Sequence, residues 1–203
     1  MATAVTPSET KQATQGQIDK AVANYRALLE KHVPNFGTEA VQTVLGQSEL
    51  AEEQFTVFRK RVEEISKMFV RHFKVDRTKT RRQMIEALGR NEYVSDDVLE
   101  TMPVDGPEEG DLFFFPIKRN TPASEVAGLL DRHNLIIDPV AQFQVNADDS
   151  AFADERPNGV QWQDSLGRYC FAAFGRWRGE RGVGVGRDDV GWGGDWWLAG
   201  RRK

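Results

Sequence analysis

The spacing of apolar residues changes along the chain, and this change limits the fold more than any other feature. Phe55, Phe58, Val62, Ile65 and Phe69 recur at intervals of three and four residues, which is the period of a helix with one apolar face. Residues 180–186 instead alternate strictly, as the side chains of a β-strand do. The chain is therefore predicted to belong to the α+β class, with helices first and a sheet last.

Two further helical patterns precede the strongest one. Residues 17–31 carry an apolar stripe, and a break at Pro34 separates it from a second helix that begins at Thr38. Residues 17–74 are therefore expected to form a helical region. A packed helical hairpin and a short oligomerising coiled coil explain the Phe55–Phe69 spacing equally well.

The middle of the chain mixes helical and strand-like segments. Capping residues and prolines near a first turn predict several short helices, and an apolar run interrupted by proline predicts a buried strand. The expected elements are helices at residues 80–88, 121–130 and 138–145, a turn at 91–93 and a strand at 112–117.

The C-terminal third reads as short strands separated by turns. Strands are expected at residues 169–174, 180–186 and 196–199, with turns at Asn158-Gly159 and Leu166-Gly167. These strands would form a short antiparallel sheet within a mixed domain of residues 75–203. Along the middle strand, alternation predicts that two valines point inward and three glycines point outward, namely Val183 and Val185 against Gly182, Gly184 and Gly186.

The composition excludes several classes of protein. The net charge is −4 and 29% of the residues are charged, and no run reaches the roughly 18 apolar residues that a membrane helix needs. Residues 1–16 are polar, lack the apolar stretch of a secretory signal and are expected to be a disordered leader. Cys170 is the single cysteine, so no intramolecular disulfide can form. These features predict a cytoplasmic protein without a membrane partner.

No pattern of an active site or of a cofactor site is present. His32, His72 and His133 lie far apart in the sequence, and one cysteine cannot build a cysteine-rich zinc site. The glycines of residues 182–186 lack the spacing and the following helix of a dinucleotide-binding fingerprint. The chain is therefore expected to be non-enzymatic and to need no metal or cofactor.

The C-terminal segment differs in composition from the rest of the chain. Residues 168–203 carry eight Lys or Arg against four Asp or Glu, four of the five tryptophans and nine of the 18 glycines. Arginine and tryptophan are enriched at binding hot spots, and glycine on the outer face of a strand offers nothing to packing. A ligand-binding surface is therefore predicted here, with Arg178, Arg181, Gly182, Gly184, Gly186, Arg187, Asp188, Asp189, Gly191, Trp192, Gly193, Gly194 and Asp195 as candidate residues.

Several segments in a fixed order suggest a family resemblance. The segments Pro157–Trp162 and Tyr169–Phe174, the glycine- and arginine-rich strand, Trp192 and the ending Trp196–Lys203 together resemble the C-terminal domain of C-type-lectin-like variable proteins. Such proteins occur in bacteria and phages and are diversified by retroelements. The resemblance extends from about Leu112 to the C-terminus and does not cover the N-terminal helices.

This resemblance implies a compact lectin-like domain that displays variable side chains on a short sheet and its loops. Adenine-directed mutagenesis would alter the candidate residues named above other than Trp192, while Val183, Val185, Trp192 and Trp197 would be framework. The chain lacks the calcium–sugar motifs of sugar-binding lectins and the paired cysteines of the related sulfatase-activating oxidases. Neither carbohydrate binding nor oxidase chemistry is therefore expected.

Three functions are compatible with the sequence. The leading hypothesis is a ligand-binding display protein whose ligand is another protein. The second is a nucleic-acid-binding module that uses the C-terminal arginines and tryptophans, with an affinity that falls steeply with salt. The third is a phage-associated structural or assembly protein that acts through the Phe55–Phe69 helix. Any homo-oligomer is expected to form through the N-terminal helices.

Overall fold

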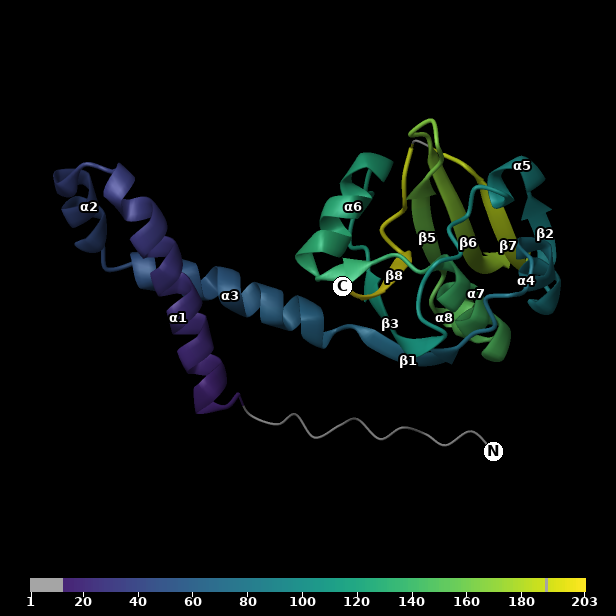
Figure 1. The fold of residues 1–203 in the computed structure, drawn as a ribbon, viewed down its shortest axis with the longest axis horizontal. Helices are drawn as coiled ribbons and strands as arrows, with labels where there is room; N and C mark the ends of the chain where they lie inside the picture. The colour runs from purple at the N-terminus through teal and green to yellow at the C-terminus, as the bar shows by residue number, and fades with distance from the viewer. Residues whose placement is uncertain (1–12, 189) are drawn as a thin grey trace. The chain divides into compact units, whose positions relative to one another are not determined.

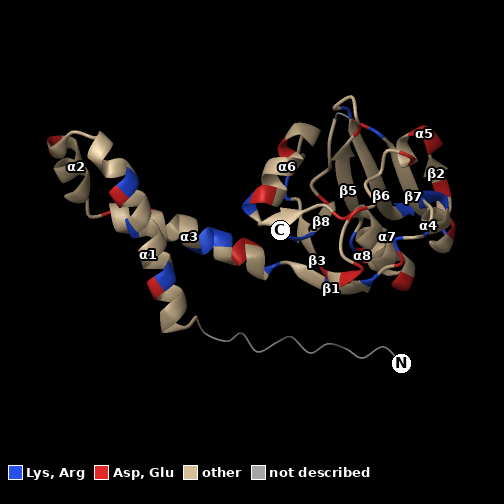
Figure 2. Cartoon of the chain, in the orientation of Figure 1, with Lys and Arg blue, Asp and Glu red and all other residues tan. Residues whose placement is uncertain are grey.

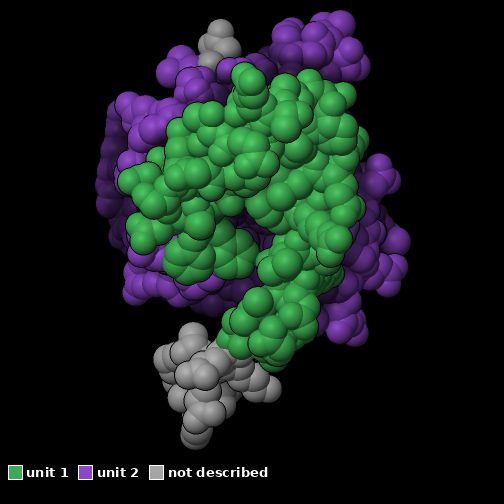
Figure 3. Space-filling model, turned by 90° about the vertical axis from the view of Figure 1, so that its left-hand side faces the viewer, with its two compact units in different colours: residues 1–58 green, residues 59–203 purple. Residues whose placement is uncertain are grey.

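The computed structural model describes residues 13–188 and 190–203, within which eight α-helices, a short 3-10 helix and an eight-stranded sheet are found (Figure 1). The predicted α+β class with N-terminal helices is thereby confirmed. The chain divides into two compact units, residues 1–58 and residues 59–203 (Figure 3). Most of the predicted leader, residues 1–12, lies outside the described residues.

The first unit contains helices whose apolar stripes stay exposed. It comprises α1 (Gln15–His32), the 3-10 helix η1 (Val33–Asn35), α2 (Thr38–Leu45) and the beginning of α3 (Leu50–Ser66). Thr14 and Gln17 form a capping box at the start of α1, which satisfies backbone donors that have no partner inside the helix. None of the residues of these three α-helices is buried. Helices of this kind gain most of their stability from burying an apolar face. In the single chain, the apolar faces of these helices are not buried and do not contribute that stability.

The second unit is built around one mixed sheet in the order β1-β3-β8-β5-β6-β7-β2, with β4 paired to β8. The pairs β5–β8 and β2–β7 are parallel, and the other pairs are antiparallel. The strands are β1 (Phe69–Lys74), β2 (Asn91–Val94), β3 (Glu109–Pro116), β4 (Leu135–Ile136), β5 (Asn158–Gln163), β6 (Tyr169–Trp177), β7 (Glu180–Arg187) and β8 (Trp197–Arg202).

One side of the sheet, which we call the helical face, is covered by four helices: α4 (Arg81–Ala87), α5 (Asp96–Leu99), α7 (Pro139–Asp148) and α8 (Phe152–Glu155) (Figure 1). Their apolar residues pack with buried side chains of the strands, such as Phe114, Phe174 and Val183. Asn158 is also fully buried here, and its carboxamide oxygen accepts hydrogen bonds from Gln142 and Asn146 of α7. These buried hydrogen bonds tie α7 to β5 and so fix its position on the sheet.

The opposite side, which we call the open face, has a smaller cover. Helix α6 (Ala123–Arg132) packs there through Val126 and Leu130, in a second apolar cluster with Phe115 and Leu198. Trp192, from the segment 190–196 between β7 and β8, joins the same cluster. Over β6, this face keeps partly exposed aromatic side chains, among them Phe171 and Trp177.

Four sequence predictions about the elements are wrong. Phe69 does not continue the helical seam but pairs with Phe114 in β1 and packs against Trp197, with ring centroids 5.3 Å apart. Residues 91–93 belong to β2, and Asn158-Gly159 opens β5 instead of forming a turn. The sheet is mixed and includes strands from the middle of the chain, so it is neither purely antiparallel nor confined to the C-terminus. In each case pairing with a distant strand overrides the local signal.

The predicted helix starts in the middle of the chain are confirmed. Thr80 forms a capping box at α4, and Asp138 accepts a hydrogen bond of 3.0 Å from the amide of Ala141 at the start of α7. The Asp138 side chain is buried and forms an ion pair of 2.7 Å with Arg77. No helix of the described residues combines the length and the apolar composition that a membrane span requires.

Candidate functional site

The hairpin of β6 and β7 determines which of the predicted residues can meet a ligand. Its turn consists of Arg178 and Gly179, both with positive φ, at 54° and 86°. This pattern is typical of the two-residue hairpin turns that match the twist of the flanking strands. Because side chains alternate along β7, its odd-numbered residues point to the helical face and its even-numbered residues point to the open face.

The two arginines of β7 point to the helical face, on the same side as the buried valines. Arg181 donates to both carboxylate oxygens of Asp154 in α8, at 2.7 to 3.1 Å, and to the hydroxyl of Ser150 at 2.9 Å. Arg187 donates to Asp97 of α5 at 2.6 Å and lies 3.4 Å from Asp164. The prediction that these arginines share a display face with the glycines is wrong, because residues 181 and 187 have the same parity as Val183 and Val185.

These contacts shift the ionisation of their carboxylates. The guanidinium of Arg181 lowers the pKa of Asp154 by hydrogen bonding, and Arg187 does the same for Asp97. The pKa of Asp164 falls to about 2, chiefly because the side chain of Arg168 donates to it, with further bonds from backbone amides of residues 166 and 168. These groups are paired within the protein, and they hold α5, α8 and the β5–β6 turn in place.

The glycines of β7 lie beneath aromatic rings on the open face. A Cβ atom at Gly182 would come within 2.1 Å of the indole of Trp177, so only glycine leaves room for that ring. Trp177 also meets Tyr93 of β2 edge to face, with centroids 5.7 Å apart. At Gly184 the nearest neighbour of a Cβ is 3.8 Å away, and at Gly186 Phe171 is 3.3 Å away. The expectation that the outward glycines have no packing role is therefore wrong at Gly182.

Replacing Gly182 with alanine is expected to destabilise the protein by about 1–3 kcal/mol, because the new methyl group forces the Trp177 ring out of its position. The matched control is Gly184→Ala, where a methyl group has ordinary contact distances and alanine suits a strand better than glycine. That change should stay within about 0.5 kcal/mol of the parent. Urea denaturation of the two variants measures the difference, and equal losses would show that Trp177 does not rest on Gly182.

Trp192 anchors the segment 190–196 to the sheet. Its side chain is only 8% exposed, and its indole N–H donates to Gln161 at 3.1 Å. The indole lies so close to Gly159 of β5 that a Cβ there would fall 2.0 Å from it. The backbones of Trp192 and Thr121 exchange hydrogen bonds of 2.8 and 2.9 Å. Trp192 is thus a buried structural residue and not an exposed aromatic anchor of a ligand site.

Gly191 explains why the chain can approach Thr121 so closely. Its φ is 109°, and a Cβ atom would lie 2.1 Å from the carbonyl oxygen of Thr121. Both the backbone conformation and the contact with backbone atoms exclude any other residue without rearrangement. Gly191 is therefore required by the fold and is unsuited to be a variable position.

Between this segment and the hairpin lies a cavity of about 260 Å³, which we call the aromatic groove. Its walls are mainly aromatic, with Phe171 and Trp177 from β6 and Trp192 and Trp196 from the segment. The ring centroids of Phe171 and Trp196 lie 6.1 and 5.3 Å from that of Trp192. Phe171, Trp177 and Trp196 are partly exposed. The remaining lining residues are Gln161, Ala173, Asp188 and Gly191.

The charge around the groove is sparse. Strand β5 carries no charged residue, and β6 carries one, Arg176, near its end. The ribbon of both strands is therefore mostly tan in Figure 2. Among the residues that the structure describes, Asp188 is the only charged one that lines the groove. Its carboxylate accepts a hydrogen bond of 2.7 Å from the amide of Val190 and is exposed. The groove therefore suits an apolar or cationic group better than an anion.

The structure brings together some of the predicted site residues and separates others. Asp188, Gly191 and Trp192 line the groove, and Gly182, Gly184 and Gly186 lie beside it under Trp177 and Phe171. Arg181 and Arg187 face the helices, and Arg178 lies in the hairpin turn. Asp189 lies outside the described residues. The other predicted residues are in the segment 190–196 but do not line the groove, namely Gly193, Gly194 and Asp195.

Five of the lining residues were absent from the sequence prediction: Gln161, Phe171, Ala173, Trp177 and Trp196. Tyr93, which meets Trp177 beside the groove, was also absent from it. One signal was present. Alternation along β6 places Phe171, Ala173, Gly175 and Trp177 on one side, and antiparallel pairing aligns that side with the glycines of β7. Tyr93 could not be found this way, because its strand comes from a distant part of the sequence.

Among the described residues, no group of three or more His, Cys, Asp or Glu side chains is arranged to hold a metal ion. Cys170 is buried. Comparison of the chain with protein-family models, with curated proteins and with solved structures returns no match.

Proposed function

We propose that the chain is a non-enzymatic ligand-binding protein and that the aromatic groove is its recognition surface. One observation carries this proposal: Phe171, Trp177 and Trp196 converge on a cavity while remaining partly exposed to solvent. Tyr93, 55% exposed, extends the same aromatic surface toward β2. Clustered aromatic side chains that are left in contact with water mark interaction sites, and tryptophan and tyrosine are prominent among binding hot spots.

A protein is the ligand class that best fits the groove. Its volume of about 260 Å³ is small for a drug-sized compound, whose pockets span roughly 300–1,000 Å³, and suits one or two inserted side chains. The rings offer faces for an apolar side chain or a cation, and Asp188 would pair with the cation. The groove is held rigid by the Trp192 anchor and by glycine contacts, so little conformational entropy is lost on binding.

Nucleic-acid binding remains the alternative, because base rings can stack on exposed tryptophans. The arrangement of charges speaks against it at this site. Arg181 and Arg187, the expected phosphate ligands, point to the other face and are already ion-paired. Asp188 would repel a phosphate backbone at the groove itself.

Selection from a random peptide library on the full chain tests the proposal. Peptides that carry aromatic or cationic anchors should be enriched. Salt should weaken their binding only modestly, because at most the single charge of Asp188 is screened. Binding of single-stranded DNA in place of peptides, with an affinity that falls steeply as salt rises, would favour the alternative function.

We also propose, as the sequence resemblance implies, that the second unit displays variable residues on a lectin-like scaffold. The structure limits which positions can vary. Gly193, Gly194 and Asp195 are at least partly exposed in the segment 190–196, whereas a side chain at Gly182 or Gly191 meets atoms within 2.1 Å. A near-copy of the end of the gene that differs at adenines, beside a reverse transcriptase, supports the proposal only if the differences avoid these two glycines.

Self-association through the N-terminal helices is the second part of this proposal. Most of the large apolar side chains of α1, α2 and α3 are 41–65% exposed, and a second copy of the chain would cover them. Such an oligomer would present several aromatic grooves together, which raises the apparent affinity for a repeated ligand. It would also serve the structural or assembly role that the Phe55–Phe69 pattern suggests. We also propose that the protein is located in the cytoplasm, where Cys170 would stay reduced.

A further inference from the structure

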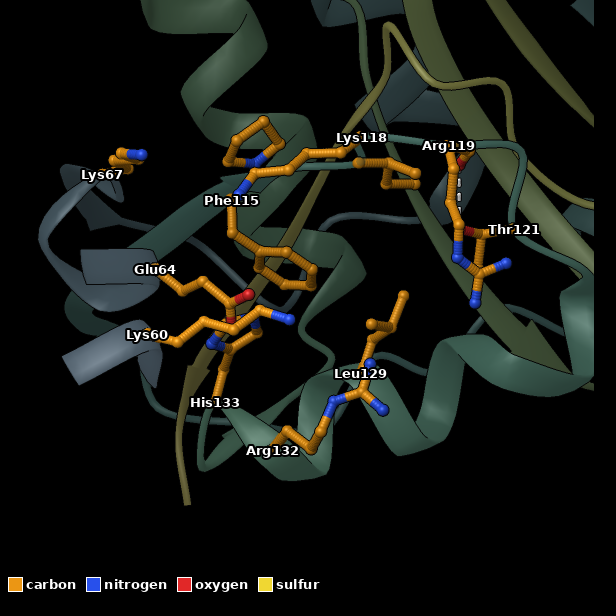
Figure 4. Close-up of a pocket in the computed structure, with 12 residues that line it drawn as sticks. Lys60, Glu64, Lys67, Phe115, Lys118, Arg119, Thr121, Leu129, Arg132 and His133 are labelled. Atoms are coloured by element: carbon orange, nitrogen blue, oxygen red, sulfur yellow. Dashed lines mark hydrogen bonds between the residues drawn. The ribbon is translucent and has the colours of Figure 1, made fainter. Parts of the chain in front are cut away.

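We infer that the second unit has a separate site, which binds a small ring-shaped anion such as an aryl phosphate. The site is a cleft of about 340 Å³ on the open face, beside α6 (Figure 4). We call it the basic cleft, because five of its lining residues are cations: Lys60, Lys67, Lys118, Arg119 and Arg132. It shares only Thr121 with the surroundings of the Trp192 anchor and is distinct from the aromatic groove.

The cations come from three places in the chain. Lys60 and Lys67 lie at the end of α3 and just after it, Lys118 and Arg119 follow β3, and Arg132 ends α6. Figure 4 shows Lys60 and Glu64 reaching from α3 toward Phe115 and His133. Within the described part of the chain, Glu64 is the only carboxylate that lines the cleft. Five cations and one carboxylate give a local charge of +4, although the whole chain has a net charge of −4.

Most of this charge is not ion-paired with any described residue. Arg119 forms an ion pair of 2.6 Å with Glu125, but residues 13–188 and 190–203 provide no carboxylate within ion-pair distance of Lys60, Lys67, Lys118 or Arg132. Like charges gathered at a concave surface repel one another and raise the local concentration of anions. A bound anion would relieve that repulsion.

The floor of the cleft is apolar. Phe115 and Ile117 are 3% and 4% exposed and Leu129 is partly buried. The imidazole of His133 lies 4.5 Å from the Phe115 ring, tilted by 45°. Burial lowers the pKa of His133, so near neutral pH this ring is uncharged and adds to the flat floor instead of the cationic rim. A floor of rings below a rim of ammonium and guanidinium groups matches a ligand with a planar apolar part and one anionic group.

Both parts of the ligand should contribute, which makes phenyl phosphate the most direct probe. Isothermal titration calorimetry on the full chain should show phenyl phosphate binding at least about 10-fold more tightly than either inorganic phosphate or benzyl alcohol. Added salt should weaken the binding, because exposed charges are screened.

The double variant Lys118→Glu, Arg132→Glu should lower the affinity for phenyl phosphate by at least about 10-fold. The matched control is Lys20→Glu, Lys31→Glu, which changes the net charge equally on α1. Thermal melts verify folding, and Lys118→Gln with Arg132→Gln replaces the first variant if that variant unfolds. Equal affinities for the three probes, or the same loss in the control as in the cleft variant, would overturn the inference.

Discussion

Replacing Trp192 with alanine is expected to lower the free energy of unfolding by about 3–5 kcal/mol, the range for removing a buried aromatic side chain. The ring fills the space above Gly159, where no Cβ can fit, so its loss leaves a cavity that the sheet cannot close. The hydrogen bond from its indole to Gln161 is lost as well. Denaturant unfolding, followed by circular dichroism, measures the change.

Trp177→Ala is the matched control for that experiment. Trp177 is a tryptophan of the same groove, but it is partly exposed and lies on the surface of the sheet. Its removal should cost about 1–2 kcal/mol, since less apolar surface is returned to water. If the Trp177 variant were the less stable of the two, the division into a buried anchor and a displayed ring would be contradicted.

Replacing Phe55 and Phe58 with glutamate is expected to convert an oligomer of the full chain into a monomer. The two phenylalanines are 61% and 54% exposed on α3, and Val62 and Ile65 continue the same face at 50% and 42%. Burial of such side chains stabilises by roughly 1.5–3 kcal/mol each, and a glutamate at the centre of the interface would have to be desolvated without a partner. Multi-angle light scattering during gel filtration measures the molar mass directly.

The charges on α3 favour an antiparallel pair of helices. With Phe55 at position a and Phe58 at position d of a heptad, Glu52 and Arg59 both occupy position e. A two-fold axis perpendicular to the helices brings the e flank of one chain against the e flank of the other. Glu52 then meets Arg59 of the second copy twice, while Phe55 packs against its Phe58. A parallel pair in register would not bring Glu52 near Arg59 of the second copy, and the heptad position that would face Glu52, residue 47, precedes the start of α3.

Cysteine cross-linking distinguishes the two orientations. In the antiparallel pair Ala51 faces Val62 of the other copy, so a mixture of Ala51→Cys chains and Val62→Cys chains should form mixed disulfide dimers. A parallel pair predicts that Ala51→Cys chains cross-link with one another. Charge reversal gives a second control: Glu52→Arg or Arg59→Glu alone should weaken the dimer, and the two changes together should restore it. A full chain that is monomeric at all concentrations contradicts self-association through α3.

Local signals in the sequence predicted the elements that depend on neighbouring residues. The starts of α4 and α7 follow from Thr80 and from Asp138 with Pro139, whose capping chemistry involves only the next few residues. The inward direction of Val183 and Val185 follows from alternation along one strand. Phe69 was misassigned because its spacing fits the helical seam, while the competing contact, Phe114 in β3, lies far away in the sequence.

The aromatic groove lies partly within the segment that the sequence pointed to, but most of its aromatic lining was absent from the predicted residues. The residue types indicated the arginines and glycines as site residues. Side chains alternate along β7, however, so Arg181 and Arg187 point to the same face as the buried Val183 and away from the face of the glycines. The function of Gly182 depends on the position of the Trp177 ring, and that of Gly159 on Trp192. Such contacts follow from tertiary packing and could not be deduced from composition.

The affinity of a library-selected peptide for the Trp177→Ala variant tests the central claim most directly. The aromatic groove predicts a loss of at least about 10-fold relative to the parent, which corresponds to about 1.4 kcal/mol or more. Ile136→Ala is the control, because Ile136 is a 41% exposed apolar residue that does not line the groove, and its affinity should be unchanged. Both variants are first shown to be folded by thermal melts. Parent-like affinity of a folded Trp177→Ala variant would contradict the proposal that the aromatic groove is the recognition surface.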